Sequence, residues 1–439
     1  MISKLSSDEV LSFLIIVSVI LITARVLGEI FRKFKQPAVI GEILAGVLLG
    51  PSLLGTLFPD LFHSLFTSEN GVPYKAFDGL AQIGIILLMF IAGFEVDLKQ
   101  IRKQGKKAAS ISLMGLLFPF ALGFIAVWFF YENIFSDASH ANKVIPAMFF
   151  GTALSITALS VIAKILLDLN ILRSKIGNLV LTAAMIDDFL GWILFSIIIQ
   201  MMGKSDGSFA SVSMVLGFTV FILTIGRWLV DKILLVADKF LSIGGLITIA
   251  VSLCLLSAVL TEYLGVRGIF GAFLMGVAIG DSKHFPERLQ SILHQFVVNI
   301  IAPLFFASIG LRVNFVTNFN LEIVAIILFI ACFAKLVGAG IGSRMSGMSR
   351  NESYAVAFGM NARGSQEIVL GTLALQAKII DEPIFVGLVV MTVITILIAG
   401  PLMKYFLAKD EPRGKSAANI EPHIAVINQQ GNSVITTAS

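Results

Sequence analysis

Two adjacent acidic residues interrupt one of the most apolar stretches of the chain. Asp187 and Asp188 follow the run LVLTAAMI and precede FLGWILFSII, so neither carboxylate lies near an end of the stretch. An acid at the centre of a membrane-spanning helix costs at least about 2.5 kcal/mol, and it is retained mainly where it faces a cavity or a partner. Because successive helical residues point about 100° apart, the two carboxylates can have different roles.

A lysine in a second apolar stretch offers a counter-charge for this pair. Lys335 lies in the middle of FIACFAKLVGAG. A Lys–Asp pair in a dry site has strongly coupled protonation states. We therefore predict that Lys335 pairs with Asp187 and that Asp188 binds a transported monovalent cation. The alternative is a permanent buried ion pair beside a spare protonated acid, which would anchor helices without carrying anything.

The composition of the chain is that of a membrane protein. Hydrophobic residues make up 57% of the 439 residues, charged residues only 14%, and the mean hydropathy is +0.92. Soluble domains contain about a quarter charged residues, whereas a bilayer core about 30 Å thick requires about 20 apolar residues per helix. Apolar windows predict an all-α membrane protein with about 13 transmembrane helices. Their predicted centres lie near residues 20, 46, 87, 119, 155, 187, 221, 252, 274, 304, 333, 365 and 395.

The basic residues predict the orientation of these helices. Most Lys and Arg residues fall on one set of alternate loops, which the positive-inside rule makes cytoplasmic. The N-terminus is then outside and the C-terminus inside, in a multi-pass protein of the inner (plasma) membrane. The net charge of +4 is therefore a topology signal and predicts no nucleic-acid partner. Four basic residues fall at or within helices instead: Arg25, Lys164, Lys335 and Arg363.

Two segments far apart in the chain resemble each other. IGEILAGVLLGPS begins at Ile40 and FGAFLMGVAIGDS at Phe270. The matched pairs are Gly41/Gly271, Leu44/Leu274, Gly46/Gly276, Val47/Val277, Gly50/Gly280 and Ser52/Ser282. The helices that follow also end alike, in GFEVD from Gly93 and GLRVN from Gly310, and the predicted topology puts these ends on opposite faces of the membrane. This pattern predicts an inverted repeat.

The repeat defines the expected domain organisation. Two inverted five-helix repeats would span about residues 37–201 and 266–406 of a transmembrane domain over residues 1–407. A polar, disordered cytoplasmic tail over residues 408–439 would follow. In secondary transporters with inverted repeats, corresponding helices of the two halves are interrupted near the midplane and line the ion site.

The fourth helix of each predicted half is the one most easily interrupted. GTALSIT covers residues 151–157 and GMNARGS covers residues 359–365. The alternative is that these small residues only allow close helix packing. Arg363 could offset exposed carbonyl ends in the second break or pair with Glu367 one turn later, which favours a scaffold role. The supporting residues of the predicted site are Arg363, Glu367, Ser155 and Glu42.

The chain resembles the monovalent cation:proton antiporters of the second family, in particular the NapA-type sodium/proton exchangers. The resemblance covers about 400 residues. It rests on QPAVIGEILAGVLLGP from Gln36, FIAGFEVDL from Phe90, LTAAMIDDFLGW from Leu181 and GMNARGSQEIVL from Gly359. It implies an NhaA/NapA-like fold with crossed discontinuous helices, a homodimer, and a core bundle that moves like an elevator.

The resemblance also implies a mechanism, in which paired acids alternately bind a cation and protons. Carried onto this chain, the resemblance implies that Asp188 and Asp187 bind the cation and the protons. Lys335 would exchange a proton with the pair, and Thr157 and Asn361 would flank the site where the helices cross. Paired acids with a lysine resemble the electrogenic branch of the family. The implied activity is exchange of intracellular Na⁺ or Li⁺ for external H⁺, and the implied partners are these ions, membrane lipids and a second copy of the chain.

Other activities remain open at this point. Potassium relatives of the Kef type continue into a nucleotide-binding domain, for which the predicted tail is too short, so a K⁺/H⁺ antiporter without that domain is an alternative. An ion sensor without transport and an organic-anion symporter are others. The sequence shows no P-loop, dinucleotide fingerprint or metal-ligand cluster. We therefore predict no cofactor, no nucleotide partner and no enzyme activity.

Overall fold

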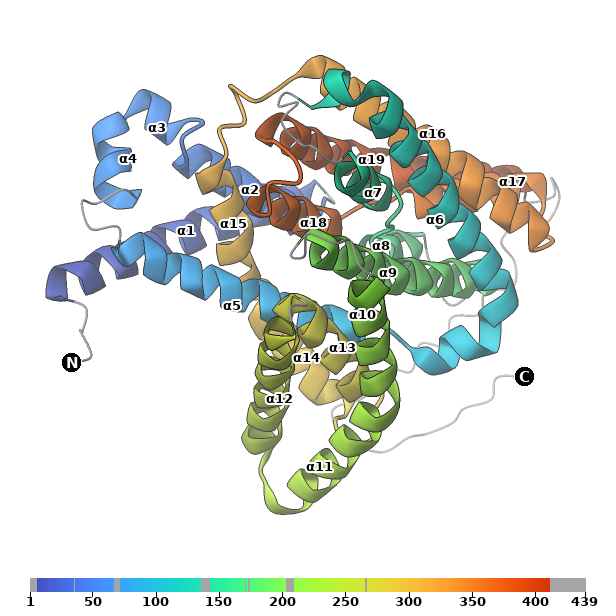
Figure 1. Cartoon of the computed structure of the whole chain (residues 1–439), viewed down its shortest axis with the longest axis horizontal. Helices are drawn as coiled ribbons and strands as arrows, with labels where there is room; N and C mark the ends of the chain where they lie inside the picture. Colours follow the sequence, from blue (N-terminus) through green and yellow to red (C-terminus); the bar gives the residue numbers. More distant parts are fainter. Residues whose placement is uncertain are drawn as a thin grey trace, which may run out of the picture.

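A computed structural model describes residues 6–34, 36–66, 72–135, 143–169, 171–172, 174–202, 209–264 and 267–410 of the chain. Within these residues, all regular elements are helices (Figure 1). They are α1 (Ser7–Lys33), α2 (Ala38–Leu49), α3 (Leu54–Leu57), α4 (Pro59–Phe66), α5 (Val72–Phe94), α6 (Leu98–Ile134), α7 (Val144–Ala153), α8 (Leu159–Asp168), α9 (Lys175–Met202), α10 (Phe209–Phe221), the π-helical turn η1 (Ile222–Gly226), α11 (Arg227–Phe240), α12 (Ile243–Tyr263), α13 (Gly268–Gly280), α14 (Glu287–Phe296), the π-helical turn η2 (Val297–Ile301), α15 (Ala302–Arg312), α16 (Leu321–Met345), α17 (Arg350–Met360), α18 (Ser365–Gln376) and α19 (Glu382–Asp410).

The all-helical membrane class predicted from composition is confirmed. Among the described residues, ten helical stretches are long and apolar enough to cross a bilayer, so the chain is a multi-pass membrane protein. The other three predicted centres, near residues 155, 274 and 365, fall on α7 with α8, on α13, and on α17 with α18. None of these helices is a full span, because α7 is separated from α8 and α17 from α18 by a break, and α13 has only 13 residues. The total of 13 crossings and their orientation stay predictions.

The predicted C-terminal boundary of the membrane domain, at residue 407, falls within α19 and stays a prediction. α19 continues to Asp410, slightly beyond the predicted boundary at residue 407. The rest of the predicted tail, residues 411–439, lies outside the described residues.

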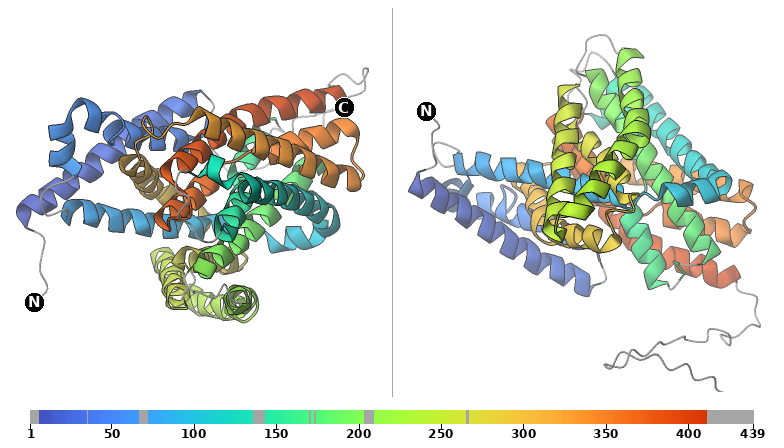
Figure 2. Two further views of the ribbon diagram at one scale, coloured as in Figure 1. Left: turned by 45° about the horizontal axis from the view of Figure 1, so that its top comes forward. Right: turned by 90° about the horizontal axis from the view of Figure 1, so that it is seen from below.

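The helices pack in two sets. The core bundle consists of α6–α9 and α16–α19, in which α6 packs along α16, and α17 packs against α19. The scaffold consists of α1–α5 and α10–α15, in which α2 packs against α15, and α5 against α13. Figure 1 shows the core bundle at the upper right, and α10 to α12 project from one side of the molecule in Figures 1 and 2. The largest cluster of buried apolar side chains connects the two sets through α9 and α13.

At Gly46 and Gly276 the backbones of scaffold helices come so close that no side chain fits between them. A Cβ atom on Gly46 of α2 would lie 2.0 Å from the carbonyl oxygen of Ala307 on α15. A Cβ atom on Gly276 of α13 would lie 2.1 Å from the carbonyl oxygen of Phe90 on α5. Gly46 and Gly276 are matched positions of the sequence repeat. Each packs against a helix of the other predicted half, as an inverted repeat would require, and the repeat itself stays a prediction.

Both helix interruptions expected from the sequence are present in the core bundle. Residues 154–158 between α7 and α8 are not helical, and neither are residues 361–364 between α17 and α18. The two breaks meet, since the N–H of Ala158 donates to the carbonyl oxygen of Ala362 at 3.0 Å. Breaks of this kind are tolerated at membrane depth only where protein or water satisfies the freed backbone groups.

Candidate ion-binding site

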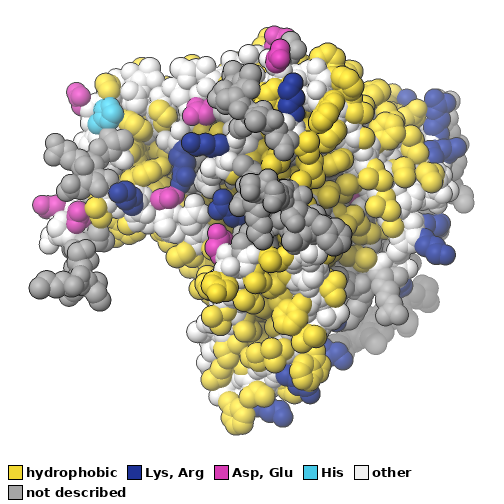
Figure 3. Space-filling model, viewed as in Figure 1, with side chains coloured by type: hydrophobic (Ala, Val, Ile, Leu, Met, Phe, Trp, Pro, Cys, Tyr) yellow, Lys and Arg dark blue, Asp and Glu magenta, His cyan; other side chains and the backbone are white. Residues whose placement is uncertain are grey.

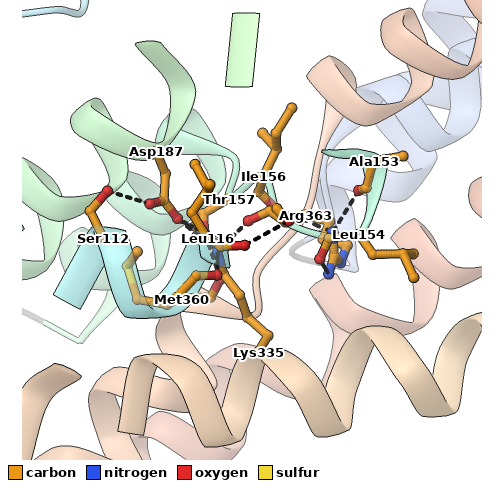
Figure 4. A network of polar contacts seen from close by, with 12 residues as sticks. Ser112, Leu116, Ala153, Leu154, Ile156, Thr157, Asp187, Lys335, Met360 and Arg363 are labelled. Atoms are coloured by element: carbon orange, nitrogen blue, oxygen red, sulfur yellow. Dashed lines mark hydrogen bonds and ion pairs between the residues drawn. The ribbon is translucent and has the colours of Figure 1, made fainter. Parts of the chain in front are cut away.

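Asp187 on α9 is surrounded by donors. Its Oδ2 atom lies 2.7 Å from Nζ of Lys335 on α16, and both side chains are fully buried. The hydroxyl of Thr157 lies 2.9 Å from Oδ2, and the hydroxyl of Ser112 donates to Oδ1 at 2.6 Å (Figure 4). The pairing of Lys335 with Asp187 predicted from sequence is therefore present. Both oxygens of Asp187 are occupied by donors of the protein.

Lys335 uses all of its hydrogen-bonding capacity. An ammonium group has three donors. Besides Asp187, Lys335 donates to the carbonyl oxygen of Gly115 at 2.9 Å and to that of Ser155. Ser155, predicted as a supporting residue, thus contributes its backbone, while its hydroxyl lies 2.6 Å from the carbonyl oxygen of Gly151. The ammonium connects α6, the first break and α9 at one point.

Asp188 has a different environment from its neighbour. Its Oδ2 atom accepts a hydrogen bond from Nε2 of Gln366 on α18 at 2.9 Å. Its Oδ1 atom is buried and has no hydrogen-bond partner. A buried carboxylate oxygen without a donor is costly, and such atoms mark functional positions. Of the two acids, Asp188 is therefore the one with an oxygen available to a cation or a proton.

Further oxygens without donors occur around the second break. The side-chain oxygens Oδ1 of Asn361, Oε1 of Gln366 and Oε1 of Glu367 are buried without hydrogen-bond partners. The amide nitrogen of Asn361 lies 3.3 Å from the sulfur of Cys332. Carboxylate and amide oxygens are the ligands preferred by hard cations. The break therefore offers the chemistry that a cation needs when it loses its water.

Arg363 and Glu367 stabilise the breaks without pairing with each other. The Arg363 guanidinium is fully buried. It donates to three carbonyl oxygens at the end of α7: those of Ala153 at 3.0 Å, Leu154 at 2.5 Å and Ile156 at 3.3 Å. Glu367 accepts from the N–H of Gly364 at 2.7 Å and so caps α18. Of the two roles considered from sequence, the structure has Arg363 offsetting exposed carbonyl ends.

A cavity of about 350 Å³ lies between the scaffold and the core bundle. Glu42 of α2, Glu95 after α5 and His294 of α14 line its scaffold wall, and Lys164 and Gln366 line its core wall. Glu42, a supporting candidate from sequence, is buried. Glu95 and Lys164 share the cavity with it. Gln366 also donates to Oδ2 of Asp188, so one side chain connects the wall of the cavity to this carboxylate.

Glu95 is a group in this cavity that titrates near neutral pH. It follows directly after the last residue of α5 and is partly buried. Burial raises the pKa of the Glu95 carboxyl to about 7. Its charge therefore changes over the pH range of an ordinary cytoplasm.

Sequence reasoning missed Ser112 and Gln366. Gln366 stands next to Glu367 in the motif GMNARGSQEIVL, and this position beside a predicted break was a usable signal. Ser112 follows Ser110 in the segment SIS of α6, and only Ser112 reaches the carboxylate. Nothing in the sequence distinguishes these two serines.

Two interrupted helices that cross beside buried ionisable side chains are the architecture of secondary transporters. A family model described as sodium/hydrogen exchanger, transmembrane, matches residues 16–409. The chain belongs to this family of cation/proton antiporters.

Individual relatives agree with this assignment. The chain is 34% identical to the Na⁺/H⁺ antiporter NhaS4 of Synechocystis, over 91% of this chain and 98% of the relative. It is 28% identical to the Na⁺/H⁺-K⁺ antiporter GerN of Bacillus cereus, over 90% and 96%. The fold is similar to that of the sodium proton antiporter MjNhaP1 of Methanocaldococcus jannaschii, with a TM-score of 0.61, 16% identity and coverage of 91% and 98%. These relatives are transporters and not enzymes.

Proposed function

We propose that the protein exchanges cytoplasmic Na⁺ or Li⁺ for external H⁺, and that both ions bind at Asp188. The observation that carries this proposal is the contrast between the two acids. Asp187 is occupied by Lys335 and two hydroxyls, whereas Asp188 keeps one oxygen without a partner. A cation and a proton then compete for one carboxylate, which makes the two fluxes opposite and obligatory.

The cavity lined by Glu42 and Glu95 supplies the route for the cation. An ion that enters from the cytoplasm meets these carboxylates first and then Gln366. At Asp188 the free carboxylate oxygen replaces part of its water shell, and the unpartnered oxygen of Asn361 is a further ligand. When a proton binds Asp188 instead, the negative charge disappears and the cation is released.

The Asp187–Lys335 pair supports electrogenic exchange. If the pair takes up a proton of its own during the cycle, more protons than cations move in each turn. The pair is fully buried, so any change in its protonation must pass through the ion site. Charge movement is therefore the measurable consequence of this second role.

The packing supports an elevator movement in a homodimer. In the described part of the chain, each side chain that hydrogen-bonds with Asp187 or Asp188 belongs to the core bundle. The cavity instead separates this bundle from the scaffold. We propose that the core bundle carries the ion across the membrane as one body, that the scaffold pairs with a second copy, and that the C-terminus faces the cytoplasm.

Proteoliposomes with an imposed pH gradient and a pH-sensitive dye test this function. We expect Na⁺ or Li⁺ to collapse the gradient and choline to have no effect. If exchange is electrogenic, clamping the membrane potential at zero will change its rate. A response to none of these cations would contradict the transport proposal and favour an ion sensor.

Potassium exchange is the second candidate, because the name of GerN includes potassium. A response to K⁺ alone in the same vesicles would replace the sodium proposal by this one. Competition between K⁺ and Na⁺ at equal concentrations distinguishes a selective exchanger from one that accepts both.

Glu95→Gln is expected to change the pH dependence of transport. Above pH 7 the wild-type carboxylate is ionised and attracts cations into the cavity, whereas below pH 7 it is neutral. The variant should therefore show an apparent KM for Na⁺ raised about 2–5-fold at pH 8 and unchanged at pH 6. Initial rates at several Na⁺ concentrations measure this difference. Asp97→Asn, which removes an exposed acid from the same segment, is the matched control; an equal effect of both variants would contradict a specific role of Glu95.

A further inference from the structure

A second cavity, of about 640 Å³, lies where α16, α17 and α19 meet. It shares no lining residue with the ion site or with the cavity beside Gln366. Its walls are largely apolar: Leu336, Val337, Ile341, Met345, Phe358 and Phe406. The lining residues on α16 run from Leu336 to Met345, which corresponds to about 14 Å of helix. Cavities of about 300–1,000 Å³ with apolar walls and a few polar groups are typical of ligand sites.

Two arginines line this cavity at the turn between α16 and α17. Arg344 donates to the carbonyl oxygen of Met348 at 2.8 Å. The Arg350 guanidinium lies 5.7 Å from the centre of the Tyr354 ring, and its nitrogens are 3.4 Å from the Tyr354 hydroxyl. In the part of the chain that the structure describes, no carboxylate lies within ion-pair distance of either guanidinium. Both positive charges are uncompensated.

Apolar walls with positive charge at one end define the chemistry of the ligand. Figure 3 shows hydrophobic side chains covering the region of α16, with Lys and Arg side chains gathered at the right edge, where α16 ends and α17 begins. Arginine binds phosphate oxygens in a forked geometry. An apolar cavity of this length is complementary to a hydrocarbon chain. A soluble anion would use the arginines but leave the apolar walls empty.

We propose that this cavity binds an anionic glycerophospholipid, with an acyl chain along α16 and the phosphate between Arg344 and Arg350. The distribution of basic residues predicts that this end of α16 is cytoplasmic. The cytoplasmic leaflet contains anionic lipids, and basic pockets between transmembrane helices on this side bind their headgroups. The site does not depend on which cation the protein transports.

The bound lipid would stabilise the helices that carry residues of the ion site. α16 carries Lys335 directly before Leu336, the first lining residue of the cavity, and α17 ends immediately before Asn361. A ligand that binds only the folded protein raises its stability in proportion to its concentration relative to Kd. Bound lipid should therefore protect the core bundle against unfolding.

Purified protein in detergent allows a direct test. Phosphatidylglycerol, phosphatidylcholine with the same acyl chains, and glycerol phosphate are added separately. The readouts are the thermal unfolding midpoint and the lipid adducts retained in native mass spectrometry. We expect phosphatidylglycerol to raise the midpoint by several degrees and to form a one-to-one adduct, and the other two to do neither.

Variants assign the effect to the cavity. The pair Arg344→Gln/Arg350→Gln should lose the selectivity for phosphatidylglycerol, whereas Lys232→Gln/Lys239→Gln, with the same change of charge on exposed positions of α11, should keep it. Gly340→Leu fills the cavity without changing charge, because a Cβ atom there has only Ala357 as a neighbour, at 3.9 Å. It should also reduce adduct formation. If the double arginine variant does not fold, Gly340→Leu still tests the proposal.

Three results would overturn the proposal. Equal shifts with phosphatidylglycerol and phosphatidylcholine would show that headgroup charge is not recognised. A shift with glycerol phosphate alone would assign the arginines to a soluble anion. Undiminished selectivity in both the arginine pair and Gly340→Leu would place the lipid elsewhere on the protein.

Discussion

Asp188→Asn is expected to reduce Na⁺-driven proton movement in proteoliposomes by at least about 30-fold, the effect of removing one partner of a buried charge interaction worth about 2 kcal/mol or more. The substitution keeps the shape of the side chain and its contact with Gln366, but it removes the negative charge of the carboxylate that keeps an oxygen without a partner. The same change removes the group that accepts the competing proton. Cation transport and proton transport should therefore be lost together.

The control for this variant is Asp60→Asn, which removes an exposed acid on α4. It should exchange Na⁺ at the wild-type rate. The unfolding midpoint of Asp188→Asn should not fall below that of the wild type, because a neutral amide is easier to bury than an unpaired carboxylate. Residual exchange at more than a tenth of the wild-type rate would place the cation on another group.

Lys335→Met is expected to destabilise the protein by about 3–5 kcal/mol, because it leaves the buried Asp187 carboxylate without its counter-charge. The double variant Asp187→Asn/Lys335→Met removes both charges, and it should recover most of this loss. Replacing a complete buried pair by neutral groups is often nearly neutral for stability. Ser112 and Thr157 remain within reach of the new amide. Unfolding midpoints of the wild type, both single variants and the double variant complete the cycle.

The double variant also separates the two roles proposed for the paired acids. It keeps Asp188, so it should still exchange cations, but without the second proton its rate should not depend on membrane potential. If Lys335→Met alone is as stable as the wild type, Asp187 does not need a counter-charge and the proposed electrogenic step has no basis. Lys232→Met, which makes the same change at an exposed position of α11, is the matched control.

The site residues that could be predicted from the sequence are charged ones, because burying a charge in a lipid environment costs free energy. Asp187, Asp188 and Lys335 have no explanation inside apolar helices unless they face each other or an ion, so their types alone indicated a site. The two breaks were predictable for a similar reason, since runs of small and polar residues weaken a helix where backbone groups can be satisfied only by protein.

The contacts that sequence reasoning missed are those of neutral polar side chains. A serine in a transmembrane helix can satisfy its hydroxyl on the carbonyl of its own preceding turn, as Ser196 does at 2.8 Å from the carbonyl oxygen of Trp192. Ser112 instead reaches a carboxylate, which depends on how α6 crosses α9. Glu95 directly follows the last residue of α5. It shares a cavity with Glu42 because α2 and α5 both pack against α15, which the sequence does not reveal.

The glycine contacts of the scaffold have a consequence for leakage. Where α2 meets α15 and α13 meets α5, backbone touches backbone, and no flexible side chain lies between the helices at Gly46 or Gly276. In the core bundle, Gly338 of α16 approaches α6 in the same way, since a Cβ atom there would lie 2.3 Å from the carbonyl oxygen of Met114. Contacts of this kind leave no room for a chain of water molecules between the helices, so protons cannot leak along them. At these contacts the described helices are therefore sealed against proton leakage, which an exchanger must avoid if it is to keep two ion gradients.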